Sequence, residues 1–176
     1  STGQINVQIP PATKAGSHTL VVRSIERKTS ARAIVTLQKY APAVFINTDT
    51  GQAMVYRPSG EAVSKIAKAK RDEPLILYAA GLGATHGGTV KAGSASPSSP
   101  LAETDKVQVF FGDPKMQQSE VIVDKSALGP GLIGIYQLNI RVPGFHEKGD
   151  DLPVTLRIGG VDSPTNGSVV PTIAVQ

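Results

Sequence analysis

Apolar and polar residues alternate in several short stretches of the chain, and a period of two is that of a half-buried β-strand. Residues 4–10 and 137–143 share one pattern, in which Gln, an aliphatic residue, Asn, an aliphatic residue, a polar residue, an aliphatic residue and Pro follow one another. The proline ends each stretch because it cannot donate a hydrogen bond to a neighbouring strand. We expect both stretches to be strands at equivalent positions in two related sheets.

The similarity between these two regions continues beyond the first strand. In both regions a polar turn closed by glycine comes next, then an alternating strand, and finally a strand followed by Gln. The corresponding segments are 14–16 and 147–149, 19–24 and 153–158, and 35–38 and 173–176. Repetition of several elements in one order predicts two copies of a β-structured unit.

About a hundred residues precede the second copy and have no counterpart before the first. Within them, short alternating or apolar runs separated by turn residues predict further strands at 43–46, 51–56, 75–79, 107–111, 121–123 and 136–142. Many short strands joined by turns favour a sandwich over a helical or βαβ fold. Residues 61–70 are compatible with a turn or two of helix or with a solvated loop.

The sequence therefore predicts an all-β protein, an immunoglobulin-like antiparallel β-sandwich with an N-terminal half-unit of related strands. Residues 40–176 are expected to form one complete sandwich of about seven to nine strands. Residues 1–38 are expected to be only the C-terminal half of a similar unit. Alternation predicts these inward-facing residues: Val44, Leu75, Leu77, Val107, Val109, Leu138, Ile140, Val154 and Leu156.

The half-unit suggests a role in assembly. Three strands with one apolar face do not make a stable sandwich by themselves. They either pack on the complete domain of the same chain or take strands from another chain, unless Ser1 is merely a cleavage point and the rest of the first unit has been lost. The predicted inter-subunit strand residues are Ile5, Val7, Ile9, Ile34 and Leu37.

The formal net charge of +4 is concentrated at Lys65, Lys68, Lys70 and Arg71. Such a run could contact a polyanion such as a cell-surface polysaccharide. Nucleic acid is not an expected partner, because no aromatic residue for base stacking lies between positions 61 and 74. A solvated loop beside acidic residues is the simpler interpretation.

No enzyme, cofactor or metal site is expected. The chain has no cysteine and no Gly-x-Ser-x-Gly motif for a nucleophile. The glycine-containing stretch 81–86 lacks the third glycine of a phosphate loop and indicates a turn. His18, His86 and His146 have no ligand partner at short spacing, and the loop aspartates Asp150, Asp151 and Asp162 do not form a calcium pattern. No apolar run approaches the length of a transmembrane segment.

Five stretches of the second region together resemble an uncharacterised family of immunoglobulin-like domains. They are residues 40–45, 51–53, 77–85, 100–102 and 129–143. The family forms the C-terminal domain of many large secreted bacterial proteins, especially in acidobacteria, and is preceded by further immunoglobulin-like domains. The resemblance implies export and a β-sandwich, and it brings no catalytic residues with it.

Two functions are consistent with these observations. The first is a structural protein, a self-associating subunit of an extracellular or cell-surface filament held together by strand pairing. The second is a passive adhesive or carbohydrate-binding module of a larger secreted protein. Aromatic residues make up only 5% of the chain. Tyr40, Tyr78 and Tyr136 fall in strand patterns that indicate packing, which disfavours a sugar-stacking platform.

Overall fold

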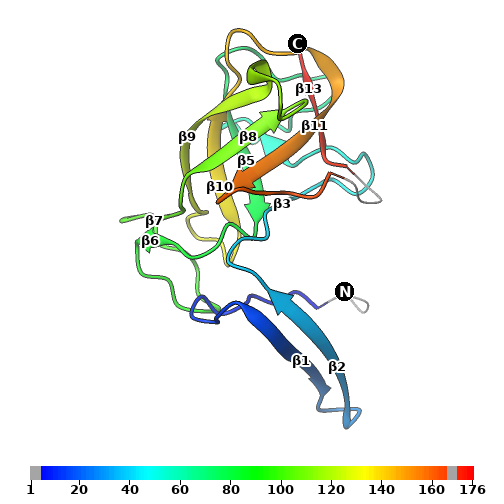
Figure 1. Ribbon diagram of the computed structural model, residues 1–176, viewed down its shortest axis with the longest axis vertical. Coiled ribbons are helices and arrows are strands. Elements are labelled where there is room, and N and C mark those ends of the chain that lie inside the picture. The colour runs from blue at the N-terminus through cyan, green and yellow to red at the C-terminus, as the bar shows by residue number, and fades with distance from the viewer. Residues whose placement is uncertain (1–4, 166–169) are drawn as a thin grey trace.

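Figure 1 shows the computed structural model, which describes residues 5–165 and 170–176. The regular elements in these residues are strands, apart from a single 3₁₀ turn, η1 (Gln117–Ser119). The all-β prediction is confirmed. Gln4 of the repeat lies outside the described residues, and so does Asn166-Gly167-Ser168, which matches the Asn-x-Ser/Thr pattern of an N-glycosylation site.

Seven strands of residues 40–176 form two facing sheets. One contains, in order, β3 (Ala43–Val44), β5 (Pro74–Ala80), β10 (Tyr136–Arg141) and β9 (Glu120–Leu128). The other contains β8 (Val107–Phe111), β11 (Gly149–Ile158) and β13 (Thr172–Val175). When these seven strands are lettered A to G in chain order, the first sheet has the order ABED and the second has the order CFG. This is the arrangement of the constant-type immunoglobulin domain. The prediction of an antiparallel sandwich is therefore confirmed.

The remaining strands of the sandwich are short. They have two residues each and bring its total to eleven: β4 (Val55–Tyr56), β6 (His86–Gly87), β7 (Ala102–Glu103) and β12 (Val161–Asp162). Residues 61–70 contain no helix, so the loop interpretation was correct. Part of this loop joins the second sheet, because Ala69 forms a parallel bridge with Val175 and its amide donates to the Ala174 carbonyl at 2.9 Å.

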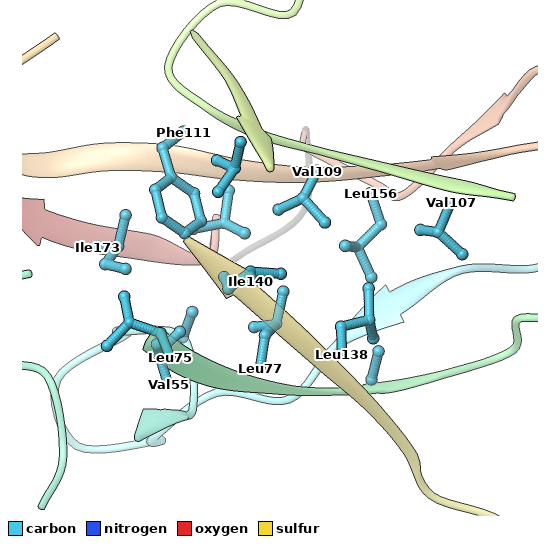
Figure 2. Packing of buried hydrophobic residues seen from close by; sticks show 14 of the residues in the cluster. Val55, Leu75, Leu77, Val107, Val109, Phe111, Leu138, Ile140, Leu156 and Ile173 are labelled. Atoms are coloured by element: carbon cyan, nitrogen blue, oxygen red, sulfur yellow. The ribbon is translucent and has the colours of Figure 1, made fainter. Parts of the chain in front are cut away.

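The core lies between the two sheets, as Figure 2 shows for Leu77 and Ile140 on one side and Val109 on the other. Eight of the nine predicted inward-facing residues are buried, and Val44 is half-buried and packed against the same cluster. Alternation works here because each strand has one face on the core. It left out Phe111, which continues the alternating row of Val107 and Val109 and is 0% exposed.

Residues 16–37 form a separate two-stranded sheet, made of β1 (Gly16–Ser24) and β2 (Thr29–Leu37). Figure 1 shows this hairpin standing off from the sandwich, with the connection to β3 at its base. Its apolar residues therefore do not contribute to the main core.

The two environments predict different responses to side-chain truncation. Leu77→Ala should lower the free energy of unfolding by about 2–5 kcal/mol, because Leu77 is 0% exposed and its loss leaves a cavity. Ile34→Ala on the hairpin should change it by less than about 0.5 kcal/mol, because Ile34 is 79% exposed. Urea unfolding followed by circular dichroism measures both values, and equal losses would contradict the assignment of the core.

Candidate functional site

The β1–β2 hairpin corresponds to β11 and β13 of the complete sandwich. Gly16 pairs with Leu37 in the hairpin, and Gly149 pairs with Val175 in the sandwich. These are matching positions of the sequence repeat, since each glycine closes the polar turn and each partner precedes the final Gln. This pairing agrees with the later part of the repeat, although β11 has a register shift between Gly149 and Leu152 that the hairpin lacks. That residues 1–38 are half of a related unit stays a prediction.

One face of the hairpin is mainly apolar, apart from His18 and the polar pair Ser24 and Thr29 at the turn. Residues that pair across an antiparallel ladder lie on the same face. The apolar face is formed by Leu20, Val22, Ala31, Ala33, Val35 and Leu37, together with His18. None of these residues is buried, and Val22 is 37% exposed. A face of this composition ordinarily packs against a second sheet.

The predicted interface residues Ile34 and Leu37 do not lie together. Ile34 pairs with Thr19 on the polar face, and Leu37 pairs with Gly16 on the apolar face. Their spacing of three places them on opposite sides of a strand. Sequence reasoning missed Leu20 and Val22, although their own alternation in a predicted strand carried the signal.

Both outer edges of the hairpin lack a strand partner among the described residues. In the complete sandwich, the equivalent of β1 is β11, whose residues Val154–Ile158 pair with β8 on the side away from β13. No strand pairs with β1 in this way, and only β1 pairs with β2. The hairpin is in register over nine residues in each strand, without a bulge or a proline. Such a regular edge is a template for strand addition.

The first segment of the repeat departs from its prediction. Residues 5–10 contain no strand, whereas their counterpart β10 is a central strand between β5 and β9. The physical reason is that the described residues offer no equivalents of β5 and β9 for this segment to pair with. Ile5, Val7 and Ile9 are 68%, 59% and 45% exposed. These three residues alternate with polar residues as in a strand, but no neighbouring strand in the described residues pairs with their segment.

A groove of about 940 Å³ runs along β9, which sequence reasoning did not identify. Strand β9 pairs with β8 only at Val109↔Val121 and Phe110↔Glu120, and the two strands then diverge. Residues 104–107 line one wall, residues 120–126 line the other, and residues 143–145 lie at one end. Between Ile122 and Lys125, β9 pairs with β10 alone among the described elements. The gap between the two strands is closed at its other end, where Glu103 pairs with Ala127 and the Thr104 amide donates to the Ser126 carbonyl at 3.0 Å.

Four of the six charged side chains that line this groove are in ion pairs: Glu103, Asp105, Asp124 and Lys125. Lys125 Nζ lies 3.2 Å from Glu103, and Lys39 Nζ lies 3.6 Å from Asp105. Arg141 donates two hydrogen bonds to Asp124, of 2.8 and 2.7 Å, which hold the pKa of that carboxyl below its ordinary value. The groove thus offers backbone and apolar surface more than it offers unpaired charge.

The predicted basic run is also largely paired with carboxylates. Lys65 lies 2.6 Å from Asp151, Lys68 forms an ion pair with Asp150, and Arg71 pairs with its neighbour Asp72 at 3.2 Å. In the described part of the chain, Lys70 is the member of the run for which no ion pair is found. The structure thus does not bring these four side chains together as an unneutralised cationic surface.

The remaining candidates for chemistry have structural explanations. Gly81 has a φ of +73°, and a Cβ there would lie 1.8 Å from the Ala41 carbonyl oxygen, so this position requires glycine for a tight turn. Each histidine contacts a backbone carbonyl: His18 that of Lys14, His86 that of Thr104 and His146 that of Glu147. Within residues 5–165 and 170–176, no three His, Asp or Glu residues form a group able to hold a metal ion. The same residues contain no helix with the length and apolar character needed to cross a membrane.

The Asp124–Arg141 pair predicts a pH-dependent contribution to stability. The folded-state pKa of Asp124 is depressed, so its contribution is present above the unfolded-state pKa and is lost as the pH falls below about 4. Asp124→Asn should therefore lower the urea midpoint at pH 7, and the difference from the original protein should shrink at pH 3. Asp49→Asn is the control, since Asp49 has no ion pair among the described residues. A difference that grows in acid would contradict the prediction.

Comparison of the chain with models of protein families, with curated proteins and with solved structures finds no match in any of the three. The functional argument consequently rests on the geometry of the hairpin and the N-terminal segment, and on the sequence resemblance of residues 40–176.

Proposed function

We propose that this protein is a non-catalytic structural protein, a subunit of an extracellular or cell-surface filament whose copies associate by strand pairing. The observation that carries the proposal is the β1–β2 hairpin, which has two regular open edges and an uncovered apolar face. A sheet of this kind is completed by strands from another molecule in many protein assemblies.

The energetic argument concerns both the face and the edges. Full burial of one Val or Leu side chain contributes about 1.5–3 kcal/mol, and the apolar face offers Leu20, Val22, Val35 and Leu37. Strand addition at an edge also satisfies backbone groups in a ladder. Because the hairpin has an edge on each side, one subunit can bind two neighbours, and head-to-tail contacts that do not close produce a fibre.

The extracellular setting is supported by the resemblance of residues 40–176 to domains of secreted bacterial proteins. The absence of catalysis is supported by the use of charged side chains in surface ion pairs. One example is Arg157 with Asp162 at 2.5 Å, which ties β11 to β12. These pairs are typical of a scaffold whose side chains stabilise the fold.

A second candidate function is an adhesive or carbohydrate-binding module, and one residue favours it. Phe145 is 92% exposed at the end of the β9 groove, where an aromatic ring could stack on a sugar. The tyrosines are less suitable: Tyr40 is buried, the Tyr136 hydroxyl donates to the Gly83 carbonyl, and Tyr56 and Tyr78 pack edge to face. A single exposed ring offers a smaller binding surface than the apolar face and the two edges of the hairpin.

The assembly proposal predicts that a charge on the apolar face weakens self-association. Leu20→Lys should raise the dissociation constant at least tenfold, which corresponds to about 1.4 kcal/mol. Thr19→Lys is the matched control, because Thr19 is the neighbouring residue on the polar face. Analytical ultracentrifugation over a wide concentration range measures the constant, and electron microscopy shows whether filaments form.

Circular dichroism of both variants would establish that the sandwich remains folded. A protein that stays monomeric at the highest attainable concentration would contradict the assembly proposal. Binding to a polysaccharide by such a monomer, lost in Phe145→Ala, would favour the second candidate.

A further inference from the structure

We infer that the end of the β1–β2 hairpin docks on an anionic lipid surface, with Ile25 of the turn entering the interface of the bilayer. The cations for the headgroup phosphates are Arg23, Arg27, Lys28 and Arg32. These four residues and Ile25 are called the hairpin tip. Figure 1 shows the turn between β1 and β2 at the end of the hairpin that points away from the sandwich. The partner is a membrane and not a second copy of the chain, so the inference goes beyond the proposed assembly and does not depend on it.

The first argument is the location of the net charge. Residues 39–176 contain thirteen Lys or Arg residues and thirteen Asp or Glu residues, so this region is formally neutral. Residues 1–38 contain five basic residues and one acidic residue, which account for the whole net charge of +4. Four of those five basic residues belong to the hairpin tip. A surface with one predominant sign of charge attracts a partner of the opposite sign.

The second argument is that the chain itself does not balance these cations. All four are exposed. Within the described ranges, neither they nor Glu26 of the same turn takes part in an ion pair. Arg23 pairs with Ser30 and Arg32 pairs with Val21, so the two arginines are diagonal neighbours on one face of the hairpin. The other two cations follow in the turn. Like charges placed together in this way favour an anionic partner.

The third argument is that exposed aliphatic residues lie among the cations. Ile25 is 92% exposed in the turn, where Gly, Pro, Asn, Asp or Ser is more usual. Ile34 is 79% exposed on the same face as the two arginines. Apolar residues beside Lys and Arg bind the interface of an anionic bilayer, whereas a soluble polyanion gains nothing from Ile25. Residues 1–39 contain no aromatic residue for base stacking, which disfavours nucleic acid.

The dimensions of the hairpin fit a tip-first orientation. At a rise of about 3.4 Å per residue, Arg23 lies about 7 Å and Arg32 about 14 Å behind Ile25 along the strands. The headgroup layer on one side of a bilayer is roughly 5–7 Å thick. With Ile25 at the inner boundary of this layer, Arg23 is level with the phosphates, and the long side chain of Arg32 can extend toward them. Leu20 and Leu37 of the apolar face lie further from the turn and stay available for assembly.

Co-sedimentation of the full chain with vesicles of phosphatidylcholine and phosphatidylglycerol in equal parts tests the role of the cations. The double variant Arg23→Gln and Arg32→Gln should lower the partition coefficient at least tenfold, because each basic side chain near an anionic surface contributes about fivefold. The matched control is Lys106→Gln with Lys115→Gln, which removes the same charge from exposed positions of the sandwich. At about 0.1 M salt charges act over about 10 Å, so the control should change the coefficient less than threefold. Equal losses in both double variants, or no binding of the original protein, would overturn the inference.

A second experiment tests the choice of a lipid surface. Ile25→Ser should lower the partition coefficient on the same vesicles at least fivefold, because the bilayer then buries less apolar surface. Ile66→Ser is the control, since Ile66 is 99% exposed on the sandwich, and it should leave the coefficient within twofold of the original. Loss of vesicle binding in Ile25→Ser with unchanged self-association in ultracentrifugation supports the inference independently of the assembly proposal. Binding to dextran sulfate that Ile25→Ser does not alter, together with no binding to the vesicles, identifies a polysaccharide site and overturns the inference.

Discussion

The packing of the ABED sheet on the CFG sheet is the interaction on which the rest of the structure depends. Leu77 and Leu138 on one side meet Val109 and Leu156 on the other, and all four side chains are 0% exposed. This contact fixes the faces of the strands, because a register shift by one residue would turn each apolar row toward solvent. The loops and short strands around it, including the part of the 61–70 loop that pairs with β13, are positioned by it.

The N-terminal region shows the same alternation of apolar and polar residues, but no second sheet in the described residues packs against it. Its hairpin keeps the register of β11 and β13, down to the pairing of a turn glycine with the residue before the final Gln. Its apolar face has no opposing sheet among the described residues, and residues 5–10 have no ladder to join. Local strand propensity and turn geometry are sufficient to form a hairpin, whereas burial of its face requires a second sheet. The proposed assembly supplies those missing neighbours from other copies of the chain.

Much of the fold follows from the sequence by itself. Alternation located β5, β8 and β10 to within about a residue at each end and identified eight fully buried core positions, because a strand with one face on the core imposes a period of two. The repeat identified the relation between the hairpin and the β11–β13 pair. Composition determined that the core is aliphatic and that disulfides play no part, since the chain has no cysteine.

Other features were decided only by the tertiary structure, because they depend on which segments become neighbours in space. Residues 5–10 have the pattern of β10 but do not form a strand, since pairing requires partners that local sequence cannot provide. Lys65 and Lys68 of the 65–71 run pair with Asp151 and Asp150, more than eighty residues away, so the charges of these two lysines are balanced at the surface. The β9 groove lies where the ladder between residues 103–110 and β9 is interrupted at Ile122–Lys125, and the sequence pattern does not record this interruption.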